Sequence, residues 1–456
     1  MAMGKRKGRQ GGLWLATQDL ARSPGHPFYE RLNRLLAGQE FDAFVERQCQ
    51  PFYAERMGRP SLPPAVYFRL LLIGYFEGID SERGIAWRVA DSLALREFLG
   101  LSLSDATPDH STISRTRRLL AVETHQEVFA WVLGVLAQRG LLKGKVLGVD
   151  ATTLEANAAM KSIVRRDSGE SYGEYLQHLA EESGEPTPTR AELARKDKKR
   201  KGKASNDDWT NPQDPDARIT RMKDGTTHLA HKAEHAVDLE TGAVVALTIQ
   251  PADRGDTQSL EITVSEALEN LEAATGKAET FCELVADRGY HSGAVLEQAQ
   301  EWEVRTYIAE PKRPRRRWQG RRDLQKSTYS NRRRIRGAHG RQLSRWRTER
   351  LERTMAHAYE TGGLRRVHLR GHDNVLKRAL VHLAGLNLGL VMRQSLRFGT
   401  PRGLQGRARR GWAALFGLVY ASWTLLRSRI RLALPNEPLW RVWRRGWGSA
   451  VPLAQI

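Results

Sequence analysis

The sequence has few cysteines and no long uninterrupted apolar run, and both absences exclude classes of protein. Its 456 residues include only Cys49 and Cys282, so it has neither a disulfide framework nor a zinc site built from cysteines, which suits a reducing compartment. The longest apolar stretch, residues 412–426, is short and interrupted by polar side chains. We expect it to form a buried or partner-facing helix, and we expect no membrane association. Residues 1–10 are basic without an apolar core, unlike a secretory signal.

Two enzyme classes are disfavoured by motifs. The chain has no Gly-x-x-x-x-Gly-Lys-Ser/Thr sequence, which argues against ATP or GTP hydrolysis. Residues 231–235 match the His-x-x-Glu-His pattern of zinc peptidases, whose chemistry needs a helix that brings both histidines to one face. This match lies in a segment rich in Val and Ala that contains a Thr-Gly turn, which predicts a β-hairpin. On a strand, Glu234 would point away from His231 and His235. We therefore expect that these residues form no zinc-peptidase site.

The charge is strongly positive. There are 73 Lys and Arg against 52 Asp and Glu, a net charge of +21 with a pI of about 10.2. Such a balance indicates a polyanionic partner, most simply nucleic acid, with an anionic membrane surface as the other option. The charge is densest in residues 312–350, where 16 of 39 positions are Lys or Arg and Trp318, Tyr329 and Trp346 are interleaved. This combination favours a nucleic-acid track over an ordinary solvated surface.

Residues 1–142 are predicted to form a helical DNA-binding domain, because apolar residues recur at spacings of three and four. The segment from about residue 80 to residue 120 resembles a helix-turn-helix, in which a basic helix begins near Asp109. An ordinary solvated basic helix in a bundle explains the same pattern equally well. The candidate DNA-binding side chains of this helix are Ser111, Thr112, Ser114, Arg115, Arg117 and Arg118.

The pattern changes at residue 143, and residues 143–395 are predicted to form a second, α/β domain. The expected strands are 145–150, 229–238, 243–250, 283–286 and 304–309, and the expected helices are 257–274 and 292–302. This order predicts a mixed, partly antiparallel sheet with flanking helices. Residues 160–227 interrupt it as an insertion that we expect to be mobile or loop-rich. Residues 396–456 form a basic C-terminal segment that contains tryptophans and carries no chemistry that we can assign.

Two aspartates occupy equivalent places in this domain. Asp150 and Asp287 each follow an apolar strand, so their carboxylates converge if the strands are neighbours. Taken alone, Asp150 is better explained as the cap of the next turn than as a metal ligand. Glu352 lies in a predicted helix that could cover the same edge. Carboxylates gathered there would form a hard, oxygen-rich site for Mg²⁺ or Mn²⁺. Two such ions could activate a nucleophile and stabilise a leaving 3′ oxygen.

Taken together, these motifs resemble those of bacterial insertion-sequence transposases with an RNase H-like DDE domain. The similar segments are residues 58–64, 70–72, 108–115, 148–152, 286–290, 352–357, 363–366 and 369–371. The resemblance covers about residues 15–395. It implies an RNase H-like mixed sheet preceded by an all-α DNA-binding domain. It also implies that Asp150, Asp287 and Glu352 are the catalytic residues and bind two Mg²⁺ ions, with Mn²⁺ as a substitute.

Glu352 is the third acid after Asp150 and Asp287, and the motif around it departs from the pattern of many relatives. Those relatives have Tyr, Arg, the catalytic Glu and Lys at fixed spacings. Counted from Glu352, the three other positions hold Arg345, Thr348 and Tyr359, so the expected lysine is missing. Glu349 is the competing third acid. Arg365 or Arg366 could contact the transposon-end phosphate in place of the lysine. The DNA contacts expected from this half of the chain are therefore Arg345, Arg365, Arg366 and Arg370.

The function expected from these observations is DNA transposition. Water would cut the transposon end, and the freed 3′-hydroxyl would then attack target DNA without a covalent protein intermediate. The partners would be double-stranded DNA at the terminal inverted repeats and the target, and a second copy of the chain, since two ends must be joined in one assembly. The expected location is the bacterial cytoplasm, in association with the nucleoid. The alternatives are a DNA-binding regulator and a stand-alone RNase H-like nuclease.

Overall fold

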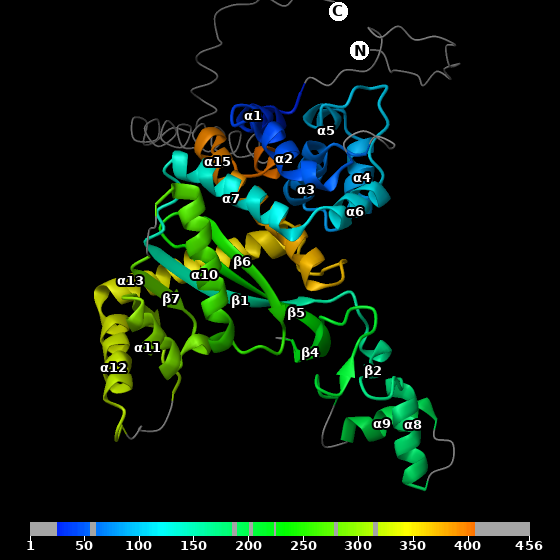
Figure 1. Cartoon of the computed structure of the whole chain (residues 1–456), viewed down its shortest axis with the longest axis vertical. Coiled ribbons are helices and arrows are strands. Elements are labelled where there is room, and N and C mark those ends of the chain that lie inside the picture. Colours follow the sequence, from blue (N-terminus) through cyan, green and yellow to red (C-terminus); the bar gives the residue numbers. More distant parts are fainter. Residues whose placement is uncertain are drawn as a thin grey trace, which may run out of the picture. The chain divides into compact units, whose positions relative to one another are not determined.

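The computed structural model describes residues 25–54, 61–184, 189–199, 204–222, 225–277, 281–312 and 318–405. Residues up to Pro401 form one compact unit (Figure 1). The helix expected at 412–426, most of the segment 396–456 and part of the 58–64 motif lie outside the described residues.

The N-terminal part is helical, as predicted. Its helices are α1 (Pro27–Ala37), α2 (Phe41–Cys49), α3 (Pro64–Glu77), α4 (Glu82–Ala90), α5 (Leu93–Phe98), α6 (His110–Leu119) and α7 (Val122–Gln138). Helix α3 is central, because its residues are buried on almost every side. It begins on a proline, whose fixed φ suits the first turn of a helix, and ends at Gly78, whose φ of +67° closes the helix in the left-handed region.

The second part is built on the mixed sheet that the sequence predicts. Its strands are β1 (Val146–Glu155), β4 (Arg218–Arg221), β5 (Thr227–Asp238), β6 (Val244–Pro251), β7 (Glu283–Ala286) and β8 (Arg305–Ile308). Their order is β4-β5-β1-β7-β8, and β6 also pairs with β5. Strand β1 is antiparallel to β5 and parallel to β7, which is parallel to β8. The buried centre of the sheet is therefore β1, with β5 and β7 on its two sides.

Two long helices connect the sheet to the N-terminal helices. Helix α10 (Asp256–Thr275) packs on β5, β6 and α7, and α15 (His372–Leu396) packs on β6, α3 and α7. Asn387 of α15 clamps β6, because its side chain accepts a hydrogen bond from the Val244 N–H at 2.9 Å and donates one to the Val244 carbonyl at 2.8 Å. This amide explains how a polar residue fits inside an otherwise apolar helix.

Helix α15 also bears on the question of a membrane. Within the described residues, the segment His372–Leu404 is long and apolar enough to cross a bilayer, and α6 with α7 passes the same test only as a pair bent by 97°. The apolar window of the former segment is 89% buried inside the protein. Its apolar side chains are therefore explained by packing between the sheet and the N-terminal helices.

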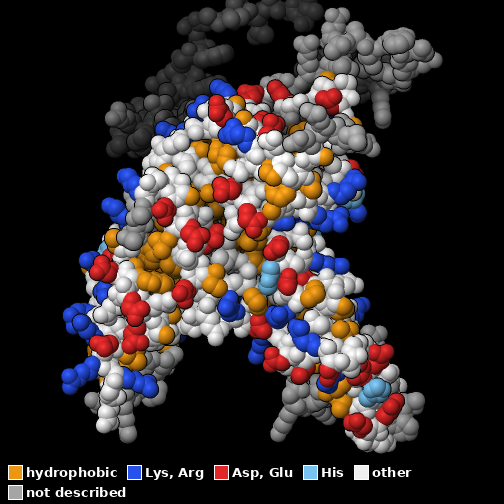
Figure 2. All heavy atoms as spheres, in the orientation of Figure 1, with side chains coloured by type: hydrophobic (Ala, Val, Ile, Leu, Met, Phe, Trp, Pro, Cys, Tyr) orange, Lys and Arg blue, Asp and Glu red, His pale blue; other side chains and the backbone are white. Residues whose placement is uncertain are grey.

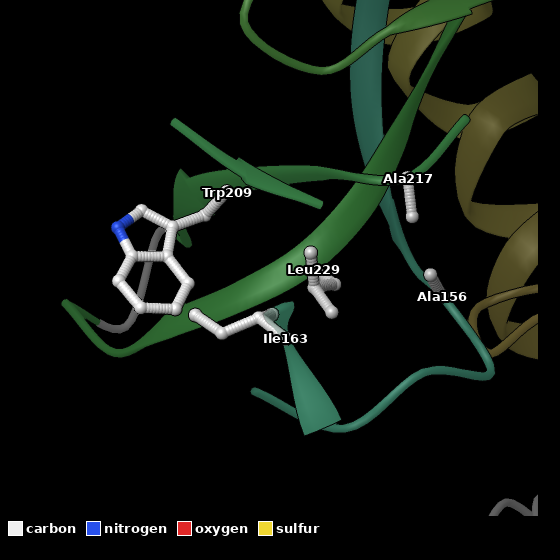
Figure 3. Packing of buried hydrophobic residues seen from close by; sticks show 5 residues of the cluster. All are labelled: Ala156, Ile163, Trp209, Ala217 and Leu229. Carbon is white, nitrogen blue, oxygen red and sulfur yellow. The ribbon is translucent and has the colours of Figure 1, made fainter. Parts of the chain in front are cut away.

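The insertion at 160–227 contains more structure than the predicted loop. It forms α8 (Tyr172–Glu182), α9 (Arg190–Lys199) and the paired strands β2 (Val164–Arg165) and β3 (Trp209–Thr210), and it ends with β4. A small core packs the insertion against the ends of β1 and β5 (Figure 3), and it is made of Ala156, Ile163, Trp209, Ala217 and Leu229. These helices and strands correct the loop-rich prediction in part, and the sequence did not indicate most of them because the core joins residues far apart in the chain. A local sign was present, since Ser171 and Glu174 form the capping box that starts α8.

A group of helices packs next to β8 at the end of the sheet. Helix α11 (Gly293–Glu301) precedes β8, and α12 (Arg322–Arg336) and α13 (Ala338–Trp346) follow it. Helix α12 is anchored to β8 by Asn331, which exchanges two hydrogen bonds with the backbone of Ile308. The chain then continues through the helical segment 347–361, which carries Glu352.

Candidate active site

Asp150 and Asp287 lie side by side at one place in the sheet. The parallel pairing of β1 and β7 runs as far as Val149 opposite Ala286, so each aspartate is the next residue on its own strand path. The prediction that β1 ends at Asp150 was wrong, because pairing with β5 continues as far as Glu155. The shorter β7 does end before its aspartate. The register of the two parallel strands therefore brings the carboxylates together.

Glu352 joins them from the helical segment that follows α13. Residues Arg347–Glu352 form a π-helix (η5), followed by α14 (Arg353–Ala356) and a second π-helix (η6, His357–Thr361). Asp150, Asp287 and Glu352 all line one open pocket of about 380 Å³. The other lining side chains include Thr152, Arg347, Met355, Tyr359 and Arg365. The sheet thus contributes two acids to this pocket, and the helix contributes the third.

Arg347 is a functional candidate that the sequence did not reveal. Its guanidinium lies 3.5 Å from Asp150 Oδ2 and 3.2 Å from Glu352 Oε1, so it bridges the two acids. A π-helix bonds residue i to residue i+5, which places Arg347 and Glu352 on the same face. An α-helical spacing would instead have placed Thr348 there.

The pocket suits a cation. The acids are accessible, since the side chains of Asp150 and Glu352 are 23% and 48% exposed and Asp287 is exposed. Their oxygens are the hard ligands that Mg²⁺ and Mn²⁺ prefer. One positive group, the Arg347 guanidinium, already stands between two of them. In this arrangement no three His, Cys, Asp or Glu side chains within the described residues are close enough to hold a metal ion together.

Glu349, the competing third acid, faces elsewhere. It lines two other pockets, one with Arg345 on the outside of α13 and one beside α15, and neither includes Asp150 or Asp287. The structure therefore separates Glu349 from the two aspartates and places Glu352 with them.

Position 359, where the lysine was expected, holds a tyrosine with a different role. Tyr359 is buried, and its hydroxyl is hydrogen-bonded to His235 Nε2 rather than being presented to solvent. Arg365 is exposed, lines the pocket and pairs with Glu360. Arg366 is exposed in a separate pocket beside the N-terminal helices, and Arg370 is exposed and donates to the Asn157 carbonyl. Of the expected phosphate contacts in this region, Arg365 is therefore the one beside the acids.

The candidate DNA-binding helix at the N-terminus is α6. Asp109 caps it by accepting a hydrogen bond from the Ser111 N–H. Ser111, Arg115 and Arg118 are exposed, Thr112 and Ser114 are half-buried, and Arg345 on α13 is exposed. Arg117 has to be withdrawn from this group, because its side chain is buried and paired with Glu82 of α4. Its role is to hold α4 and α6 together.

The zinc-peptidase pattern lies on β5, as the predicted hairpin requires. His231 is buried against Asp214, with Nε2 3.1 Å from Oδ2, and His235 contacts Tyr359. Glu234 points to the opposite face of the sheet, toward α10. The three side chains do not share a face, so no peptidase site exists here.

Comparison with known families gives two matches in separate parts of the chain. Residues 17–119 match the family described as Transposase domain (DUF772), and residues 207–388 match the family described as Transposase DDE domain. The second match contains Asp287 and Glu352 and begins after Asp150. No solved structure matches the chain. The DDE domain implies that the mixed sheet is an RNase H-like fold. The chain belongs to the insertion-sequence DDE transposases.

Proposed function

We propose that this transposase cuts the ends of its insertion sequence and joins the freed 3′-hydroxyl to target DNA, with Asp150, Asp287 and Glu352 as metal ligands. The observation that carries the proposal is that three carboxylates from three separate elements line one open pocket. DDE transposases act on DNA and generally use divalent metal ions. Our proposal is more specific: two Mg²⁺ ions, with Mn²⁺ as a substitute.

The chemistry fits the groups in the pocket. Bound Mg²⁺ supplies Lewis acidity to the scissile phosphate and the attacking oxygen. The carboxylates hold the ions and neutralise part of their charge. Arg365, at the rim, is placed to pair with a DNA phosphate, since a guanidinium can donate two parallel hydrogen bonds to phosphate oxygens.

The basic layer beyond β8 is the proposed DNA track. Figure 2 shows Lys and Arg side chains along the edge formed by α12 and α13. The exposed cations of these helices and the turn before them are Arg321, Arg322, Lys326, Arg333, Arg336, Arg341 and Arg345. Tyr329, among them, is 42% exposed, and the Arg332 guanidinium lies over its ring, 4.8 Å from the ring centre. Because Asn331 fixes the opposite face of α12 to β8, the charges are held outward. Residues 313–317 of the predicted track lie outside the described residues.

The substrate is double-stranded DNA in this proposal: the terminal inverted repeats, bound in part by α6, and the target. Each strand-transfer event joins two transposon ends, so we propose a homodimer in the DNA-bound assembly. Counter-ion release by so many cations predicts that DNA affinity falls steeply with salt concentration.

Strand cleavage by single-site variants tests the proposal. Asp150→Asn, Asp287→Asn and Glu352→Gln remove one carboxylate charge each, and each is expected to lower Mg²⁺-dependent cleavage of an end-containing duplex about a thousandfold, because metal catalysis is worth several kcal/mol. DNA affinity should not fall. Glu349→Gln is the matched control, since it makes the same change three residues earlier on the same helical segment and should leave cleavage intact.

Two further outcomes separate the alternatives. Joining of a pre-cut end with a free 3′-hydroxyl to target DNA would distinguish a transposase from a stand-alone nuclease. Full cleavage activity in any of the three acid variants would contradict the mechanism, and DNA binding without any cleavage by the wild-type protein would indicate a regulator.

A further inference from the structure

Strand β5 pairs with β1, whose residues line the pocket, and two adjacent residues on β5 reach opposite faces of the sheet. Glu234 and His235 are both buried, with 0% and 1% exposure. Side chains alternate along a strand, so Glu234 points toward α10 and His235 toward the helical segment that carries Glu352. Neither residue lines the pocket.

Glu234 is a buried carboxylate surrounded by hydroxyl groups. It accepts hydrogen bonds from Ser259 Oγ and Thr263 Oγ1, both at 2.6 Å, and from the Tyr290 hydroxyl at 2.8 Å. The ammonium group of Lys232 is 3.5 Å away. Three donors and a nearby cation compensate for a charge that would otherwise be costly to bury.

The hydrogen bond from Tyr290 connects this network to the second acid. Tyr290 ends the short helical turn η4 (Arg288–Tyr290), which begins immediately after Asp287. Burial and the neighbouring Glu234 raise the pKa of Tyr290 far above its usual value, so its hydroxyl stays protonated and donates. The same turn is closed from its other side by Asp256, whose carboxylate fills the space that a side chain at Gly289 would need.

His235 makes the corresponding connection to the third acid. It is the register partner of Asp150 across the β1–β5 ladder, and its Nε2 is hydrogen-bonded to the hydroxyl of Tyr359. Tyr359 follows Glu352 by seven residues on the same helical segment. Both side chains are buried, so this hydrogen bond is shielded from water.

We propose that Glu234 and His235 are positioning residues, which set the Asp287 turn and the Glu352 helix relative to Asp150 through Tyr290 and Tyr359. This inference rests on the proposed function. Apolar residues of similar size would fill the same space at lower cost in desolvation. The two hydrogen bonds instead end on the two elements that carry the remaining acids, and they fix those elements against the strand that pairs with β1.

Removing single hydroxyl groups tests this inference. Tyr290→Phe and Tyr359→Phe each delete one hydrogen bond and keep the ring. Tyr307→Phe is the matched control, because the Tyr307 hydroxyl donates to the buried Glu283 at 2.9 Å in the same sheet, at the end of β7 away from Asp287. The readout that does not depend on activity is Mn²⁺ binding to the full chain without DNA. The electron paramagnetic resonance signal of the free ion measures this binding.

Tyr290→Phe and Tyr359→Phe should weaken Mn²⁺ binding about tenfold, the usual size for residues that orient metal ligands, and raise the Mg²⁺ concentration for half-maximal cleavage. Tyr307→Phe should leave both unchanged. His235→Gln, which keeps an acceptor for Tyr359, should bind Mn²⁺ better than His235→Leu. If His235→Leu does not fold, Tyr359→Phe tests the same bond.

Wild-type metal dependence in both tyrosine variants would overturn the inference, as would an equal loss in Tyr307→Phe. Failure of the proposed function has a different signature. In that case the wild-type protein would not cleave, or Asp287→Asn would bind Mn²⁺ as the wild type does.

Discussion

Arg347 provides the sharpest test of the proposed metal site, because a metal ion bound there would compete with this guanidinium for the same carboxylates. The perturbation is Arg347→Gln, which removes the cation and keeps a polar side chain of intermediate length. The contacts to be lost are those of 3.5 Å to Asp150 and 3.2 Å to Glu352. With Arg347 absent, an incoming ion has no internal ion pair to break.

The magnitude follows from Coulomb's law. Unit charges about 4 Å apart interact by about 1 kcal/mol in water and about 4 kcal/mol near a protein surface. The acids are 23% and 48% exposed, which favours the lower limit for each contact. Together the two contacts are worth about 1–2 kcal/mol, which corresponds to roughly tenfold in affinity. Arg347→Gln should therefore bind Mn²⁺ about tenfold more tightly than the wild type.

The assay is Mn²⁺ titration of the protein without DNA. Arg345→Gln is the control, since it removes the same charge two residues earlier, from an exposed side chain in a different pocket. It should change the affinity less than twofold, because exposed charges are screened by salt. Cleavage by Arg347→Gln should fall at saturating metal, since the displaced guanidinium would otherwise pair with DNA phosphate. Unchanged or weaker Mn²⁺ binding in Arg347→Gln would refute the reasoning, as would equal tightening in Arg345→Gln.

Two further predictions concern stability. Burial lowers the pKa of His125, His235 and His382 to about 3, so these imidazoles are neutral in the folded protein while the unfolded chain binds protons below about pH 6.5. Stability should therefore fall as pH drops from about 6.5 toward 3, by up to about 1.4 kcal/mol per pH unit for each histidine. Burial also lowers the pKa of His357 and His372, which adds to the slope. Urea unfolding between pH 7 and 5 measures this slope, and His382→Gln should reduce it. A Cβ at Gly148 would lie 2.6 Å from a methyl carbon of buried Leu239, so Gly148→Ala should lower the free energy of unfolding by roughly 1–3 kcal/mol, and an unchanged thermal midpoint would contradict this packing.

Much of the fold was predictable because its signals are local. The apolar runs before Asp150 and Asp287 predict strands, the Thr-Gly turn predicts the β5–β6 hairpin, and the spacing of apolar residues before residue 142 predicts helices. The family resemblance, which rests on short motifs, selected the acids. The sequence also predicted that Glu234 lies on the other face of the sheet from His231 and His235, because side chains alternate between the two faces along a strand.

What the sequence determined by itself was therefore the helical type of the N-terminal part and the order of the strands and helices outside the insertion, because these depend on neighbours along the chain. Only the tertiary structure decided which polar groups meet. It buried Arg117 against Glu82, turned Glu349 away from the aspartates, and used a π-helical turn to bring Arg347 between Asp150 and Glu352. The first two outcomes depend on contacts between residues that are distant in sequence. The third depends on a helical register that departs from 3.6 residues per turn. Local periodicity in the sequence encodes neither the long-range contacts nor this register.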